Sequence, residues 1–170
     1  QEADLNAIQK VVETVFSDEE DKIIRNLACD LLTETASPSI KSLVAKVDHQ
    51  IIGYVSFSPI FLKSETDVSG YILAPLAVSP EHQKQGVGSN LIQSGIDMLT
   101  KEGAGVLLVY GDPDYYGRFG FEEEIGHAFV PPYPLAYPSG WMGVMMNGTI
   151  LPHSPAKFAC VAALSKSELW

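Results

Sequence analysis

Apolar residues recur with two different spacings along the chain, and each change of spacing marks the border of a predicted element. Apolar positions three or four residues apart indicate helices, whereas alternating or continuous runs rich in β-branched residues are typical of strands. By this criterion we expect helical segments over residues 5–16, 23–32, 85–101 and 114–119. We expect strands over residues 42–47, 51–61, 70–78, 106–110, 141–146 and 158–164.

Polar, Pro-containing and Gly-containing segments separate these elements. Asp4 is a predicted N-cap of the first helix, and the acidic run 18–21 would place negative charge at the start of the second. Residues 48–50 would form the turn of a hairpin. Pro75 cannot donate a ladder hydrogen bond, so strand pairing must break there on one side. The order of elements predicts one α+β (α/β) domain over residues 1–170, with a mixed sheet.

Composition excludes several classes of protein. Of the 170 residues, 46% are hydrophobic and 19% are charged, which is incompatible with a disordered chain. The net charge of −10 argues against nucleic acid as a partner, because phosphate backbones are bound by clustered Lys and Arg. Gly and Pro interrupt every long uncharged stretch, so we expect no membrane helix and no membrane partner.

The two cysteines and the first residue give information on the cellular compartment of the protein. Cys29 and Cys160 lie among apolar neighbours, without a CxxC partner or a His at metal-ligand spacing. We therefore expect buried free thiols in a reducing compartment, no metal site, and a cytoplasmic protein without a signal peptide. Because the first residue is Gln and not Met, we also expect that a few residues precede Gln1, which leaves a leader or a first strand open.

The clearest chemical feature is the junction between the strand at 70–78 and the helix at 85–101. Its loop contains Gly86 and Gly88, and helix N-termini offer unpaired N–H groups and partial positive charge to a phosphate or pyrophosphate. A Walker loop is excluded because the Lys-Ser/Thr pair is missing. A dinucleotide fingerprint is excluded because Leu91 stands where the third glycine is required.

Residues 83–88 (QKQGVG) follow the pattern Q-x-x-G-x-G, which resembles the pyrophosphate loop of the GNAT superfamily of acetyl-CoA-dependent N-acetyltransferases. Upstream, residues 75–80 (PLAVSP) resemble the family's fourth strand. Downstream, residues 116–121 (YGRFGF) match its Y-x-x-x-G-F signature. The longer segment 111–121 (GDPDYYGRFGF) is similar to one bacterial subfamily of predicted acetyltransferases, and the motifs together cover about residues 70–121.

This resemblance implies a single GNAT domain with a mixed, mostly antiparallel, twisted sheet and helices on both faces. Its fourth and fifth strands, here 70–78 and 106–110, would splay into a wedge that receives acetyl-CoA. The implied acetyl-CoA-binding residues are Leu76, Ala77, Val78, Gln83, Lys84, Gln85, Gly86, Val87, Gly88 and Ser89. Gln83 replaces the equally common Arg, so the helix dipole, Lys84 and Arg118 would supply the positive potential.

The resemblance also implies a chemistry and its residues. A neutral amine would attack the thioester carbonyl directly in a ternary complex, an oxyanion would form, and CoA thiolate would leave. A backbone N–H near Leu76 or Val78 is the candidate oxyanion donor. Tyr116 occupies the family's position for the general acid that protonates the thiolate. We expect its neighbours Tyr115 and Phe119 to belong to the core.

A general base is harder to identify. The titratable candidates are Glu65, Asp67, Glu81, His82, His127 and His153. We expect the last four to be surface groups, and a chain of water molecules would serve instead. Asp112 is expected to cap the following turn, although its place at the end of a strand also faces the wedge.

The last third of the chain, residues 125–170, has few charges and many aromatic residues. We expect its strands to complete the sheet under a Pro-rich cover. In the alternative, Pro131–Pro138 lines the acceptor pocket or a dimer contact.

The sequence is thus interpreted as an acetyl-CoA-dependent N-acetyltransferase, monomeric or homodimeric, that acts without a metal on a primary amine of a small molecule or peptide. Its acidity mildly favours a cationic acceptor. The alternative is a non-catalytic acyl-CoA-binding regulatory module.

Overall fold

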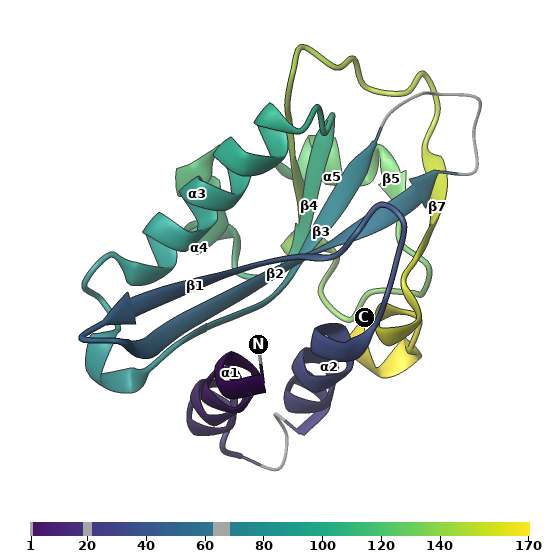
Figure 1. Cartoon of the computed structure of the whole chain (residues 1–170). Coiled ribbons are helices and arrows are strands. Elements are labelled where there is room, and N and C mark those ends of the chain that lie inside the picture. Colours follow the sequence, from purple (N-terminus) through teal and green to yellow (C-terminus); the bar gives the residue numbers. More distant parts are fainter. Residues whose placement is uncertain (1, 19–21, 63–68) are drawn as a thin grey trace.

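Two amphipathic helices lie against one side of a curled sheet in the computed structural model, which describes residues 2–18, 22–62 and 69–170 (Figure 1). They are α1 (Glu2–Val15) and α2 (Lys22–Thr33). Each buries one apolar stripe, which includes Val12 of α1 and Leu31 of α2. Because α1 begins at Glu2, Asp4 lies inside the helix and the predicted N-cap was wrong. Of the predicted acidic run, residues 19–21 lie outside the described residues.

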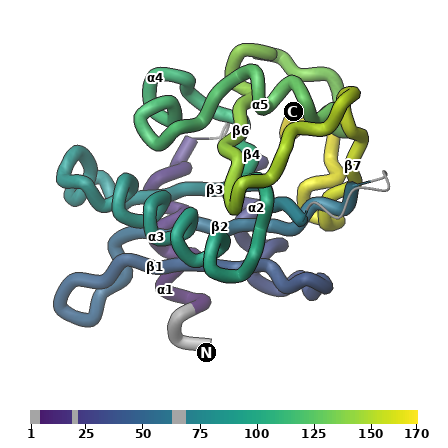
Figure 2. Tube along the Cα trace, turned by 90° about the horizontal axis from the view of Figure 1, so that it is seen from above, coloured from purple at the N-terminus to yellow at the C-terminus, as the bar shows by residue number. Residues whose placement is uncertain are grey.

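A mixed sheet forms the centre of the molecule, and within the described residues it has seven strands. The strands are β1 (Lys41–Val47), β2 (Gln50–Leu62), β3 (Gly70–Val78), β4 (Val106–Tyr110), β5 (Phe129–Val130), β6 (Trp141–Met145) and β7 (Ala156–Cys160). The order is β5-β7-β2-β3-β4-β6, with β1 paired to the first part of β2 (Figure 2). The pairs β3–β4 and β5–β7 are parallel and the others antiparallel, so the predicted fold class is confirmed.

The predicted hairpin joins β1 to β2. Asp48 and His49 form its turn with φ values of 46° and 67°, the left-handed conformations that a two-residue turn matching the strand twist requires. The strand β2 is buried almost throughout and pairs with β1, β3 and β7. This central position explains why its sequence is nearly continuous in apolar residues.

The strands β3 and β4 separate halfway along β3, as predicted for the wedge. Their parallel pairing runs from Gly70 beside Val106 to Leu73 beside Val109 and then ends. Residues 74–78 continue beside β2 alone, with a register shift between Val55 and Phe57 at the level of Pro75. Since Pro75 has no N–H to donate, the ladder is interrupted at the point where the two strands separate.

The helix α3 (Val87–Lys101) covers the opposite face of the sheet from α1 and α2 (Figure 1). Its buried side chains include Leu91, Ile92 and Leu99, which belong to the apolar face predicted from the sequence. Gly95 allows close packing, because a Cβ placed there would lie 2.0 Å from the ring of Phe57. Helices therefore cover both faces, and the first turn of α3 is held at the opening between β3 and β4.

The chain after β4 is less regular than the sequence predicted. The expected helical turn is present as α4 (Pro113–Tyr116) with a 3-10 turn at Gly117–Phe119, and the exposed acidic run 122–124 leads into an unpredicted helix, α5 (Glu123–His127). The last predicted strand, 158–164, is wrong in position, because β7 ends at Cys160. Both carboxylate oxygens of Glu34 accept hydrogen bonds from the backbone N–H groups of Ala162 and Ala163, which turn the chain away from the sheet.

Both cysteines are free thiols, as predicted, but each is half-buried and not enclosed. Burial raises the pKa of the Cys160 thiol, which keeps it protonated near neutral pH. Among the described helices, none combines the length and apolar character needed to cross a membrane.

Candidate functional site

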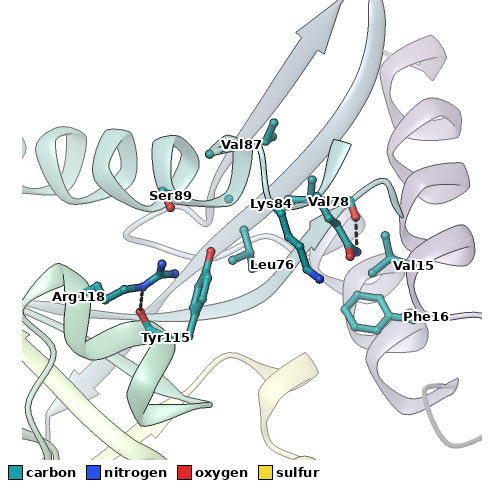
Figure 3. A pocket seen from close by; sticks show the side chains of 12 residues that line it. Val15, Phe16, Leu76, Val78, Lys84, Val87, Ser89, Tyr115 and Arg118 are labelled. Atoms are coloured by element: carbon teal, nitrogen blue, oxygen red, sulfur yellow. Dashed lines mark hydrogen bonds between the residues drawn. The ribbon is translucent and has the colours of Figure 1, made fainter. Parts of the chain in front are cut away.

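A cavity of about 650 Å³ lies where β3 leaves β4 (Figure 3). Four parts of the chain meet there: the end of α1, the end of β3, the loop that enters α3, and the segment at α4. The lining residues are Val15, Phe16, Leu76, Val78, Gln83, Lys84, Gly86, Val87, Gly88, Ser89, Tyr115 and Arg118. Eight of the ten predicted acetyl-CoA-binding residues therefore line one cavity.

The loop into α3 presents a run of backbone donors. The N–H groups of residues 84–89 donate to no acceptor within the described parts of the chain, and the first helical bond runs from Asn90 N–H to the Gly86 carbonyl. Gly86 is the N-cap residue and has no side chain to satisfy these donors. Six consecutive unpaired N–H groups at the positive end of a helix dipole constitute a site for an anion.

Left-handed backbone conformations shape this loop. Gly86 has φ 85° and Lys84 has φ 58°, an uncommon conformation for a residue with a side chain. No heavy atom lies within 4 Å of the position that a Cβ would take on Gly86. The glycine therefore serves the backbone conformation and leaves open the space through which a ligand approaches the donors.

Side chains add positive charge and hold the loop in place. Lys84 and Arg118 line the cavity, and Figure 3 shows them on opposite sides of Leu76 and Tyr115. The side-chain amide of Gln83 donates to the Val78 carbonyl (3.0 Å) and so ties the loop to the end of β3. The Gln85 side chain does not line the cavity, and it donates instead to the Glu81 carbonyl (2.9 Å).

The end of β3 turns alternate backbone groups toward the opening. Ser79 N–H donates to the Ile52 carbonyl of β2 at 2.8 Å. Since polar groups alternate sides along an antiparallel pair, those of Val78 and Leu76 point away from β2, into the space that β4 has left. The side chain of Ala77 is buried against α1 and α2, so any contact of this residue with a ligand would be indirect.

The two adjacent tyrosines of α4 have different surroundings. Tyr115, expected in the core, lines the cavity, and a Cβ placed on Gly88 would lie 2.7 Å from its hydroxyl oxygen. The Arg118 guanidinium lies 4.6 Å from the Tyr115 ring centroid, and its Nε donates to the Tyr115 carbonyl at 3.1 Å. Tyr115 thus packs against the core as expected, and it also lines the cavity because α4 turns this ring toward α3.

Tyr116 is half-buried behind Tyr115 and is not among the residues lining this cavity. Its ring meets that of Tyr115 edge-on at 5.1 Å, and a Cβ placed on Gly111 would lie 2.4 Å from its Cε2. Burial, with smaller effects of Tyr115 and the Asp112 carboxylate, raises the pKa of the Tyr116 phenol well above its usual range. The phenol is therefore protonated at neutral pH and remains a hydrogen-bond donor.

A second cavity of about 440 Å³ lies at the end of β4. Its lining residues are Tyr110, Gly111, Asp112, Pro113, Tyr137, Ser139 and Gly140. Asp112 caps α4 as predicted, because its Oδ1 accepts from Asp114 N–H at 3.0 Å, and it also borders this cavity. Tyr116 therefore packs between a residue of the first cavity, Tyr115, and a residue of the second, Gly111.

The other titratable candidates lie elsewhere. Glu81 and His82 line a separate cavity between α1 and the hairpin turn, and His127 and His153 are exposed. Glu65 and Asp67 lie outside the described residues. Within residues 2–18, 22–62 and 69–170, no three or more His, Cys, Asp or Glu side chains form a group that could hold a metal ion.

Three lining residues were missed by the sequence analysis. Val15 and Phe16 belong to the end of a helix more than sixty positions before the loop, and only the tertiary fold brings them to the cavity. For Tyr115, the hydroxyl group was the signal that could have indicated a place at the cavity, since a buried tyrosine hydroxyl must find a polar partner.

Known proteins resemble this chain in sequence and in fold. The sequence profile described as the acetyltransferase (GNAT) family matches residues 6–121. Two Escherichia coli proteins named as uncharacterized N-acetyltransferases, YjhQ and YhbS, are 38% identical over 112 residues and 39% identical over 113 residues. Each alignment covers 65% of this chain but only 62% and 63% of the relatives, so the matched region spans less than two thirds of their length.

Two solved structures resemble the chain along most of its length. One is Escherichia coli YhbS in complex with CoA, with a TM-score of 0.76 and 28% identity, covering 92% of this chain and 85% of that one. The other is a Brucella melitensis GNAT family acetyltransferase in complex with acetyl-CoA, with a TM-score of 0.65 and 27% identity, covering 96% and 93%.

Proposed function

Because the chain belongs to the acetyltransferase (GNAT) family, we propose that it is an enzyme that moves an acetyl group from acetyl-CoA to a primary amine. The two similar structures are complexes with CoA and with acetyl-CoA, which supports this choice of acyl donor. The acceptor is a small molecule or the amine of a peptide.

The observation that carries the proposal is the run of six unpaired N–H groups at residues 84–89. A pyrophosphate diester has two adjacent negative charges and several acceptor oxygens, which such a run satisfies without any side chain. Lys84 and Arg118 add two positive charges at the same cavity. Two of the eleven basic side chains therefore lie where a polyanion would bind to a chain with a net charge of −10.

The splayed end of β3 fits the remainder of the donor molecule. Leu76 and Val78 turn backbone groups toward the opening, where they would bind an extended amide-containing arm as a further strand does, although the Val78 carbonyl already accepts from the Gln83 side chain. One of their N–H groups would also donate to the carbonyl oxygen of the thioester. A donor fixed at this position stabilises the negative charge that the oxygen gains during transfer.

When bound, acetyl-CoA supplies a thioester whose acyl carbon accepts the amine nitrogen as the carbon–sulfur bond breaks. Tyr116 would donate its phenolic proton to the leaving sulfur. Its raised pKa keeps that proton in place until the sulfur becomes negative. The phenol is restored by solvent, and the proton of the incoming ammonium is lost to water before attack.

An acetyl-transfer assay with a panel of primary amines, read as thiol release and paired with calorimetric titration of acetyl-CoA, tests the proposal. We expect micromolar binding of acetyl-CoA and turnover with at least one amine. Tight binding without release of CoA above background for any amine would contradict enzymatic transfer. The chain would then be better described as an acyl-CoA-binding module.

A further inference from the structure

The second cavity has a composition that selects among ligands. Asp112 carries the single charge among its seven lining residues, and the Asp112 Oδ2 atom accepts no hydrogen bond within the described residues. Oδ1 is used in capping α4, so one carboxylate oxygen is left to face a ligand. A lone carboxylate at an otherwise neutral cavity favours a cation.

The remaining walls are flat and largely apolar. The Tyr110 and Tyr137 rings and Pro113 provide them, and Gly140 packs so closely on Tyr110 that a Cβ there would lie 3.2 Å from the ring. Tyr137 is fixed through its backbone, because its N–H donates to the Tyr110 hydroxyl at 2.8 Å. Its side chain is nevertheless 76% exposed, which leaves an aromatic face at the rim for a ligand to cover.

The size of the cavity limits the ligand. A dry cavity of about 150 Å³ is large enough for benzene, and a volume of about 440 Å³ holds a ring with a short chain. Tyr116 contacts Gly111 of this cavity and Tyr115 of the first, so the ring whose phenol is assigned to the leaving sulfur borders both cavities.

We propose that this cavity takes the acetyl acceptor, and that the acceptor is a small primary ammonium compound with an aromatic ring, such as an arylalkylamine. This inference rests on the proposed acetyl transfer. Asp112 attracts the ammonium, and the Tyr110 and Tyr137 rings cover the ring of the ligand. After losing one proton to water, the amine nitrogen forms the new bond to the acetyl carbon. The carbon–sulfur bond breaks, the sulfur takes the proton of Tyr116, and the nitrogen releases a second proton to water. The products are the amide and CoA with a protonated thiol.

The test compares benzylamine with aniline, which has the same ring but is uncharged at neutral pH, in Asp112→Asn and in the control Asp114→Asn. Asparagine at position 112 keeps a side-chain oxygen to cap α4 and removes only the charge. We expect the KM for benzylamine to rise about fivefold in Asp112→Asn, with the dissociation constant of CoA unchanged. The KM for aniline in both variants, and benzylamine kinetics in Asp114→Asn, should equal those of the wild type.

Replacement of Tyr137 by Ala tests the aromatic wall. We expect the KM for benzylamine to rise about threefold while that for methylamine is unchanged, because methylamine has no ring to cover. An NMR titration of the CoA-bound protein with benzylamine gives a readout that does not depend on turnover, since the amide signals of residues 110–112, 137, 139 and 140 should shift.

The outcomes separate this inference from the proposed function. Equal KM values for benzylamine in wild type and Asp112→Asn would overturn the inference and leave acetyl transfer intact. If no amine is acetylated, the proposed function fails. The NMR titration then shows whether the second cavity binds a cationic aromatic ligand. Shifts of the amide signals from the two segments that line the cavity would still support a cationic aromatic ligand. The absence of these shifts would overturn the inference.

Discussion

The two cavities on either side of Tyr116 are built in opposite ways. The first is formed largely by consecutive backbone groups, the unpaired N–H groups of residues 84–89, in a loop whose conformation depends on Gly86. The second is formed largely by side chains from two segments, 110–113 and 137–140, which are more than twenty positions apart. Backbone N–H donors can bind an anionic group whatever the side chains of the loop, provided that the backbone has the right conformation. Side chains, by contrast, decide which ligand is accepted.

Because of this difference, the two cavities should respond differently to substitution. The first cavity should tolerate changes of side chain and fail when the backbone conformation changes, while the second should respond mainly to its side chains. The ring of Tyr116 contacts Gly111 of the second cavity and Tyr115 of the first. Substitution should therefore have the largest effect at Tyr116, a smaller one at Gly86 and the smallest at the side chains of the loop.

The largest effect is expected from Tyr116→Phe. Loss of the phenolic proton should lower kcat on the order of 100-fold and leave the dissociation constant of CoA unchanged. The matched control is Tyr115→Phe, the same change one position earlier, where the hydroxyl lies beside Gly88. Steady-state kinetics should show kcat of this control within about threefold of wild type and a small change in the KM for acetyl-CoA. Exchange of the two phenotypes would show that Tyr115 is the proton donor.

The next effect is expected from Gly86→Val, which forces a β-branched residue into φ 85° and fills the approach to the donors. CoA affinity should fall roughly 30-fold, the equivalent of one or two charge-assisted hydrogen bonds. Gly103→Val is the control, because Gly103 has φ 84°, equally open surroundings and a place at the other end of α3.

Both glycine variants should lose about 1–2 kcal/mol of stability, since both place a side chain in the left-handed region. Denaturant unfolding measures this loss and calorimetry measures the affinity. Equal affinities for CoA in the two variants would mean that the phosphates bind outside the loop.

Parts of both cavities could be predicted from the sequence, to different extents. The loop was recognisable because its function is carried by residues adjacent in sequence, so that Gln83, Gly86 and Gly88 keep a fixed spacing. The break in pairing at Pro75 could be predicted because a missing N–H is a local property, whereas the splay of β3 from β4 was expected only from the family resemblance. For the second cavity, the expectation that Asp112 caps α4 is confirmed. The alternative that Pro131–Pro138 lines an acceptor pocket stays a prediction, and Tyr137 of that segment borders this cavity.

What the sequence analysis missed depends on tertiary packing. Phe16 reaches the first cavity because α1 packs beside β3, and the spacing of apolar residues gives only the buried face of a helix. Tyr115 packs against the core as expected, but its place at the cavity depends on how α4 is turned, which the sequence does not give. The strand expected at 158–164 ends early because Glu34 binds the backbone at Ala162 and Ala163.

The smallest effect is expected from side chains of the loop. Lys84→Ala should weaken CoA binding about fivefold at low salt, and less at 1 M salt, where charge interactions are screened. Gln85→Ala is the control, because that side chain is turned away and bonds to Glu81. Calorimetry of both variants at two salt concentrations checks the expectation. A loss for Lys84→Ala as large as that for Gly86→Val would contradict recognition by backbone groups.

The most direct test of the central claim is an NMR titration that follows the backbone amides of residues 84–89. CoA is added in one experiment and pantetheine, which lacks the pyrophosphate, in another. We predict that CoA shifts these amide protons strongly downfield, as hydrogen bonds to phosphate oxygens do, and that pantetheine leaves them in place. If CoA binds and the amides of residues 84–89 do not move, the unpaired N–H groups are not the phosphate site.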